Sequence, residues 1–142
     1  MTPIENLKPG LRHQLTIAVD ERLTVPSVSA AYAGFADMPP VFATAFLVGL
    51  VEWTCIEALR PYLAPEQRTV GVHVDLSHSA ATPVGMKVTA AVELIAIDDR
   101  RLRFKVSCRD EVEAISEGWH DRFVVDGARF MARIERKRAL AS

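Results

Sequence analysis

Cysteine is scarce in this chain, and Cys55 and Cys108 are too few for a disulfide framework. Both lie in apolar patterns, so we expect them to be small buried hydrophobic residues and free thiols in a reducing cytoplasm. The sequence also lacks an apolar run of membrane-spanning length, because its longest apolar stretch is interrupted by Glu52 and closed by Arg60 and Pro61. The N-terminal residues have no basic start and no apolar core of a signal peptide. These absences predict a cytoplasmic protein without a membrane segment.

An excess of charge is missing as well, since 17 Lys and Arg residues face 18 Asp and Glu residues and the formal net charge is -1. Such a balance provides no field to attract nucleic acid or anionic lipid. The sequence contains no G-x-S-x-G motif, no glycine-rich phosphate loop, no H-E-x-x-H motif and no paired cysteines spaced for zinc. We therefore expect no metal or other cofactor, and the predicted partners are a small-molecule substrate and a second copy of the chain.

The most informative stretch is residues 42–59, FATAFLVGLVEWTCIEAL, which has the length of a helix and is apolar on every side except at Glu52. Pro39 and Pro40 place its start between residues 40 and 43, and Pro61 marks its end. A helix apolar on all sides must be buried. Burying an unpaired carboxylate costs several kcal/mol, so Glu52 needs a partner or an altered protonation state.

Alternating apolar and polar residues predict strands elsewhere in the chain, over residues 11–25, 70–79, 86–97 and 101–109. Two further strands, 114–125 and 128–134, are predicted to form a hairpin around Asp126 and Gly127, and the basic C-terminal residues are taken as a solvated strand end. Between the first strand and the helix, residues 26–40 form an ordered loop that contains Tyr32, Phe35 and Met38.

One long helix and a set of antiparallel strands predict a single α+β domain, residues 1–142, in which the sheet wraps around one central helix. A sheet of this kind has edge strands to protect, and one sheet cannot cover a helix that is apolar on every side. Pairing with a second copy solves both problems, so the chain is expected to be a dimer.

Three residues stand out as candidates for chemistry. Thr44 and Glu52 share one stripe of the helix, but their backbones are about 12 Å apart, so a further group must bridge them. Alternation along GVHVDLSHS places His78 on the face of Val72, Val74 and Leu76, and directs His73 to solvent. His78 is therefore predicted to point inward, where an imidazole could bridge the two.

Structural roles for these three residues remain open on composition alone. Glu52 could form a salt bridge at a subunit interface or pair with a lysine, and His78 could be a core histidine with satisfied hydrogen bonds. Thr44 could bond only its own backbone in the first helical turn. No comparable argument singles out His13 or His120.

The segments FATAFLVGLVEWTCIEALRPYL, VGVHVDLSHSAATPVG and WHDRFVV together resemble the fluoroacetyl-CoA thioesterase family of the hotdog-fold thioesterases, over about residues 35–135. The resemblance implies a hotdog fold, a homodimer with two sheets side by side, and a Thr/Glu/His constellation that acts on an acyl-CoA thioester. Carried over by position, the three catalytic residues are Thr44, Glu52 and His78.

The same resemblance implies four substrate-binding positions, which fall on Phe35, Met38, Gly71 and Arg122. Met38 stands where the family has phenylalanine, so a preference for a fluorinated acyl group is not implied. Arg122 and the turn at 79–83 could hold the coenzyme A arm, although Arg122 could equally form a structural salt bridge.

The expected function is hydrolysis of a short-chain acyl-CoA thioester, with backbone N–H groups of residues 43–45 as donors to the developing oxyanion. His78 would be the general base, Glu52 would orient it or attack directly, and Thr44 would position water or the carbonyl. The alternative is a non-catalytic acyl-CoA binding module on the same fold. A hydratase would need a different acid and histidine motif.

Overall fold

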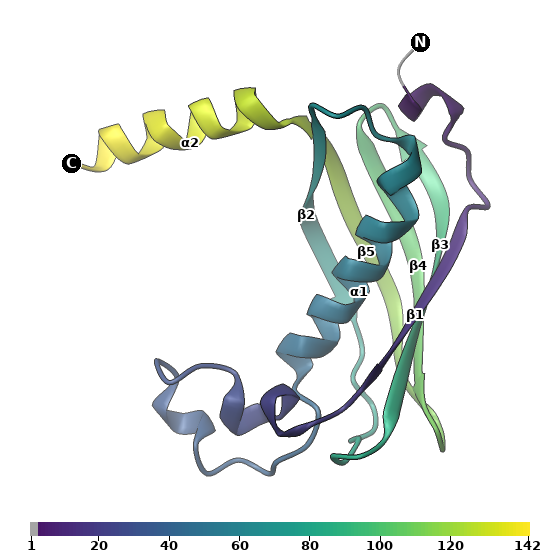
Figure 1. Cartoon of the computed structure of the whole chain (residues 1–142), viewed down its shortest axis with the longest axis vertical. Coiled ribbons are helices and arrows are strands. Elements are labelled where there is room, and N and C mark those ends of the chain that lie inside the picture. The colour runs from purple at the N-terminus through teal and green to yellow at the C-terminus, as the bar shows by residue number, and fades with distance from the viewer. Residues whose placement is uncertain (1–2) are drawn as a thin grey trace.

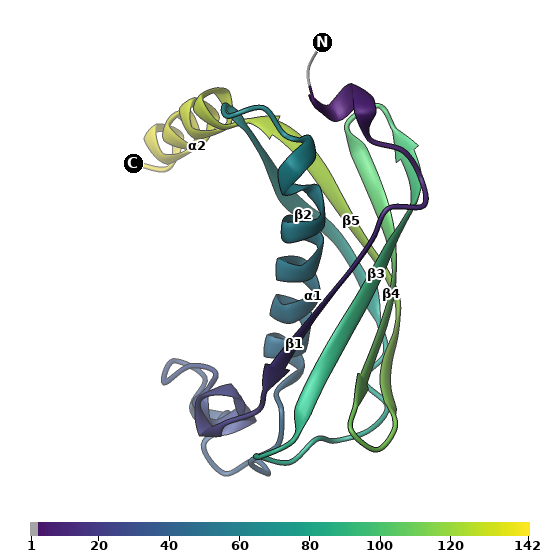
Figure 2. The ribbon, with the colours of Figure 1, turned by 45° about the vertical axis from the view of Figure 1, so that its right-hand side comes forward.

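The computed structural model describes residues 3–142 and contains a curved antiparallel sheet wrapped around one long helix (Figures 1 and 2). Met1 and Thr2, part of the segment predicted to carry no targeting signal, lie outside the described residues. The five strands lie in the order β1-β3-β4-β5-β2. Their bounds are β1 Arg12–Ala18, β2 Gln67–Leu76, β3 Lys87–Asp98, β4 Arg101–Asp110 and β5 Ala114–Asp126. The predicted α+β architecture is therefore confirmed.

Helix α1, Thr44–Leu59, begins one residue after the predicted range of 40–43 and ends directly before Arg60 and Pro61, as predicted. It lies in the concave face of the sheet, where its buried residues meet the inward side chains of β3 and β4 (Figure 2). The alternation in β4 is complete, because Leu102, Phe104, Val106 and Cys108 are buried and the charged residues between them are exposed. Both cysteines are free and buried, and burial raises the pKa of each thiol to about 12.

One side of α1 is not covered by its own chain, as expected for an apolar helix that a single sheet cannot surround. Ala45, Gly49 and Trp53 follow one another at intervals of four residues on this side, and Trp53 keeps 46% of its surface exposed. The neighbouring edge strand β2 exposes Val72 and Val74, each at 44%. An apolar surface of this kind is typical of a face that another molecule covers.

A β-bulge interrupts β2 between Gly71 and His73. Before the bulge Gly71 pairs with Arg122 of β5, and after it Val74 pairs with His120, so both sit on the concave face although their numbers differ in parity. Strict alternation therefore does not continue across the bulge, and Val72 is the residue of β2 without a partner in the register. The strand also ends at Leu76, so His78 lies beyond it.

The first strand is shorter than predicted, since β1 ends at Ala18 and short 3-10 turns follow: η2 Glu21–Leu23, η3 Val25–Ser27 and η4 Ala33–Phe35. Asp20 stops the strand because its carboxylate accepts a hydrogen bond from the backbone N–H of Arg22 at 2.9 Å. We call residues 20–40 the lid segment. It projects from the end of the molecule where α1 begins (Figure 1).

The predicted C-terminal hairpin was wrong, because residues Gly127–Ala141 form a helix, α2. Asp126 does not begin a hairpin turn; it caps this helix, and its Oδ1 accepts from the backbone N–H of Arg129 at 3.0 Å. The following residues ARFMARIERKRAL are mostly good helix formers, and Phe130 and Ile134 have helical spacing. Within residues 3–142, neither α1 nor α2 combines the length and apolar character that a bilayer span needs.

Candidate active site

Thr44 and His78 meet at the N-terminal end of α1. The Thr44 Oγ1 and His78 Nδ1 atoms are 2.7 Å apart and share a hydrogen bond. Thr44 is placed by the first turn of the helix, and His78 by the segment that leaves β2 and runs past it. The inward direction predicted for His78 is therefore confirmed, and the hydroxyl of Thr44 does contact a side chain outside its own helix.

The second ring nitrogen of His78 has no partner among the described residues. Its Nε2 atom is buried and unpaired, and the ring of Phe42 lies edge-on at 6.4 Å between centroids. Burial lowers the pKa of His78, since a charged imidazole would be poorly solvated there. A neutral imidazole with a free nitrogen in a half-buried position is suited to accept a proton.

Backbone donors are present beside this pair, but not at all three of the predicted positions. The Ala43 N–H donates to the Leu23 carbonyl oxygen at 3.0 Å and so fastens the lid segment to the start of α1. The N–H groups of Thr44 and Ala45 have no acceptor within the described part of the chain. Two free donors at a helix N-terminus attract negative charge.

Glu52 finds its partner within the same chain. Its Oε2 atom accepts a hydrogen bond from Arg122 Nη1 at 3.0 Å, and the side-chain exposures are 38% for Glu52 and 4% for Arg122. Arg122 is held from its other side by Thr69, whose hydroxyl and carbonyl oxygens each accept at 2.9 Å. The partner of Glu52 is thus an arginine of β5, and its direct hydrogen bond is to Arg122 and not to His78.

His120 is a member of this hydrogen-bond network that the sequence reasoning missed. It is fully buried, its Nδ1 atom is 2.8 Å from the carbonyl oxygen of His73, and its Nε2 atom is 3.1 Å from Arg122 Nη1. A carbonyl only accepts and a guanidinium only donates, so His120 carries its proton on Nδ1 and is neutral. Its alternation with Arg122 on one face of β5 is the signal that could have identified it.

Gly71 lies against this network from β2. A Cβ atom at this position would be 2.7 Å from Glu52 Oε2, 3.2 Å from His120 Cε1 and 3.4 Å from Arg122 Nη1. Any side chain at residue 71 would push the Glu52 carboxylate away from Arg122. The glycine therefore leaves the space in which the ion pair forms.

Acid is expected to destabilise the protein through His120, because burial, together with the charge of Arg122, lowers its pKa. A histidine in the unfolded chain titrates near pH 6.5, so below that pH the unfolded state binds the proton more readily. The free energy of unfolding is then unaffected by His120 above about pH 6.5 and falls as the pH drops below it. The charged groups around His120 are Arg122, Glu52 and Asp121.

Urea unfolding between pH 5 and 7 tests this expectation. His120→Gln should show a shallower loss of stability on acidification than the unchanged protein, and the remaining slope should come in part from His78, whose pKa is also lowered. His73→Gln is the matched control, because the side chain of His73 is exposed. An unchanged slope in His120→Gln would contradict the assignment.

The lid segment contains Phe35 and Met38, two of the four predicted substrate-binding residues. Phe35 is partly buried and packs edge-on against Tyr32 with ring centroids 5.5 Å apart, whereas Met38 exposes 44% of its surface. A hollow of about 510 Å³ crosses β1, β3 and β4, but none of the predicted site residues lines it. Within residues 3–142, no three His, Cys, Asp or Glu side chains gather as metal ligands would.

Comparison with known proteins identifies relatives of this chain. The profile of the family described as "Fluoroacetyl-CoA-specific thioesterase" matches residues 19–128. A fluoroacetyl-CoA thioesterase from Streptantibioticus cattleyicolor is 38% identical over 133 residues, which cover 94% of this chain and 96% of that protein. The chain belongs to the fluoroacetyl-CoA-specific thioesterase family.

Two solved structures extend the comparison for this member of the fluoroacetyl-CoA-specific thioesterase family. A variant of the fluoroacetyl-CoA thioesterase in complex with acetyl-CoA superimposes with a TM-score of 0.90 at 37% identity, over 92% of this chain and 98% of that one. A hot-dog-like protein from Thermanaerovibrio acidaminovorans has a TM-score of 0.81 at 20% identity, over 96% and 97% of the two chains. The predicted hotdog fold is confirmed.

Proposed function

We propose that this chain hydrolyses a short-chain acyl-CoA thioester to the free acid and coenzyme A. The observation that carries the proposal is the hydrogen bond between Thr44 and His78 at the N-terminus of α1, in a member of a thioesterase family. The 38% identical relative is named for fluoroacetyl-CoA, and a related structure was solved with acetyl-CoA. Both names specify an acyl group of two carbons, which favours a short chain here.

His78 is the general base of this mechanism. When His78 Nδ1–H donates to Thr44 Oγ1, the Nε2 lone pair is free, and Nε2 is the nitrogen without a partner. Nε2 takes a proton from water as the water oxygen adds to the thioester carbonyl carbon. The C–S bond then breaks, and the departing thiolate of coenzyme A takes the proton from His78.

Thr44 and Ala45 stabilise the intermediate through their backbones. Negative charge develops on the former carbonyl oxygen, and the two free N–H groups in the first turn of α1 are its donors. The positive end of the helix dipole adds to their effect. Thr44 therefore acts twice, through its hydroxyl on His78 and through its N–H on the oxyanion.

Glu52 holds the attacking water, on the side of the thioester opposite to Thr44. Arg122 engages Oε2 and keeps the carboxylate fixed, while Oε1 has no hydrogen bond within the described residues. Gly71 and His120 maintain this ion pair, so Arg122 acts by positioning Glu52. Trapping of an acyl group on Glu52 would instead assign direct attack by the carboxylate.

Phe35 and Met38 line the acyl end of the site in this proposal. Both come from the lid segment, which is fastened to α1 by the hydrogen bond between Ala43 and Leu23. The flexible thioether of Met38 adapts to acyl groups of different shape more easily than a phenyl ring does. We therefore propose that acetyl and propionyl groups are accepted along with fluorinated ones.

A homodimer accounts for the uncovered surface of α1 and β2. Trp53, Val72 and Val74 would be buried together with the free edge of β2, which removes an exposed strand edge. The cytoplasmic location stays a prediction that rests on the two free thiols.

Release of free thiol from acetyl-CoA and propionyl-CoA tests the function. We expect turnover of both, followed with a thiol reagent at neutral pH. Binding of acetyl-CoA without thiol release would instead assign a non-catalytic binding module. A change in enoyl-CoA absorbance without thiol release would assign a hydratase.

A further inference from the structure

Helix α2 extends away from the body of the molecule. It leaves the end of β5 and continues into open space in both views (Figures 1 and 2), and every residue from 131 to 142 is exposed. An isolated helix of 15 residues is only marginally stable in water. A helix of this length that its own chain does not cover therefore needs a partner surface.

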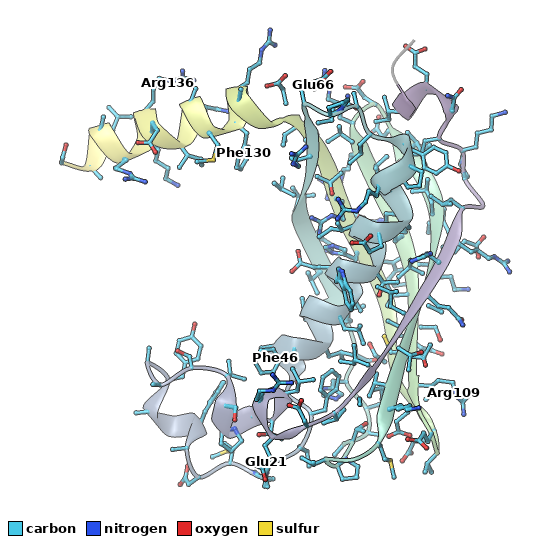
Figure 3. The ribbon with its side chains drawn as sticks, in the orientation of Figure 1. Glu21, Phe46, Glu66, Arg109, Phe130 and Arg136 are labelled. Atoms are coloured by element: carbon cyan, nitrogen blue, oxygen red, sulfur yellow. The ribbon has the colours of Figure 1, made fainter. Side chains whose placement is uncertain are left out.

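One side of α2 is suited to such a surface. Phe130, Met131 and Ile134 form a short apolar stripe at helical spacing, with Met131 exposed at 53% and Ile134 at 36%. Figure 3 places Phe130 on the side of α2 that faces the lid end of the molecule and Arg136 on a different side. The apolar stripe thus faces the concave flank between α2 and the lid segment.

The lid segment projects on the same flank from the opposite end. Between the two projections lie α1 and the free edge of β2 (Figures 1 and 2). The lid segment exposes apolar surface at Tyr32, by 57%, and at Met38, by 44%. These two surfaces belong to one chain but lie too far apart along α1 to meet each other.

The charges of the two projections are complementary. Helix α2 contains five basic residues and one acid, Glu135. The lid segment contains three acids and one arginine, and that arginine, Arg22, is already paired with Asp20 at 2.6 Å. Glu21 and Asp37 are exposed, so the lid segment presents negative charge to a basic helix.

We propose that in the homodimer α2 of each subunit lies across the lid segment of the other, with its apolar stripe on the partner's Tyr32 and the partner's Met38. A two-fold axis that joins the β2 edges antiparallel exchanges the two ends of the subunits, so the α2 end of one meets the lid end of its partner. This inference rests on the homodimer proposed above. Each lid segment would then be held in two ways, by the Ala43 N–H of its own subunit and by α2 of the partner subunit.

Cross-linking of the full chain tests the contact independently of activity. We expect Tyr32→Cys/Met131→Cys to form covalent dimers with a short bismaleimide, because the introduced thiols are exposed and the native thiols are buried with a raised pKa. The matched control is Tyr32→Cys/Arg136→Cys, which moves the second thiol off the apolar stripe. A dimer in sedimentation that cross-links no better than this control would overturn the α2 proposal alone, whereas a monomer would overturn the homodimer as well.

The introduction of a negative charge on α2 provides the second measurement. Ile134→Glu places an acid opposite Glu21 and Asp37 and is expected to raise the dimer dissociation constant by about tenfold or more, with the fold intact because Ile134 is exposed. Arg133→Ala, at the neighbouring position of the same helix, should change it less. Co-sedimentation of the unchanged protein with phosphatidylserine vesicles, abolished by Ile134→Glu while dimer affinity is unaffected, would assign α2 to a membrane surface and overturn the proposal.

Discussion

His78→Ala is expected to lower kcat for short-chain acyl-CoA hydrolysis by about 10² to 10⁴-fold, the range for loss of a general base. The substitution removes the imidazole bonded to Thr44 and the unpaired Nε2 that would accept the proton. Initial rates of thiol release from acetyl-CoA, measured over a range of substrate concentrations, separate kcat from KM. KM should change little, because the base contributes to the transition state more than to substrate binding.

The pH profile of the unchanged protein adds a second readout. Burial lowers the pKa of His78 below its usual value near 6.5, so the acid limb of kcat/KM is expected below that pH. His73→Ala is the control, because its side chain is exposed on the other face of the sheet. If His78→Ala and Glu52→Gln both retain full hydrolysis, the assignment of the site is wrong.

Arg122→Leu is expected to lower the free energy of unfolding by about 3 kcal/mol, near the lower end for breaking a buried ion pair. The guanidinium is 4% exposed and its loss leaves Glu52, His120 and Thr69 without their shared donor. The effect stays near the lower end because the Glu52 side chain remains 38% exposed and keeps some hydration. Urea unfolding at a fixed protomer concentration measures it, since dimer dissociation also depends on concentration.

Two comparisons make the Arg122 result specific. Arg101→Leu removes a guanidinium that is 46% exposed, and Asp121 keeps Arg103 as its partner, so the expected loss is below about 1 kcal/mol. Glu52→Gln should cost little stability, because an amide oxygen can still accept from Arg122, yet it should lower kcat strongly. A small loss in Arg122→Leu, similar to that of Arg101→Leu, would show that the buried pair is not a stabilising unit.

The long helix was predictable because its signals are local. Pro39, Pro40 and Pro61 mark the limits of a continuous apolar stretch, and α1 begins and ends where they indicate. Strand β4 was equally clear, since its apolar and charged residues alternate without interruption. Tertiary contacts did not have to override either pattern.

The C-terminal region shows where a local signal misled. Asp126-Gly127 is typical of a hairpin turn, but an aspartate directly before a run of helix formers is also a helix cap, and the cap is what forms. The spacing of Phe130 and Ile134 and the abundance of Ala, Arg and Lys in the tail favoured the helix. Turn chemistry was given more weight than periodicity.

The partner of Glu52 could not be assigned from the sequence, because it depends on how two distant strands align. Arg122 reaches Glu52 only because β5 pairs with β2 in one register and β2 contains a glycine at the point of contact. The burial of His120 has the same origin. Register between strands 50 residues apart is a property of the folded sheet and not of any single segment.

The bulge in β2 has a consequence for any redesign of this strand. The bulge determines which face of the sheet the residues before and after it point to. Gly71, before the bulge, leaves space for the Glu52 carboxylate, and His78, beyond the end of the strand, bonds the Thr44 hydroxyl. If Val72 were paired as an ordinary ladder residue, the strand would be regular, but every residue after Val72 would turn to the opposite face of the sheet. Regular pairing that keeps Val72 would therefore separate the acid from the base, and the bulge is the feature to preserve when this scaffold is transplanted.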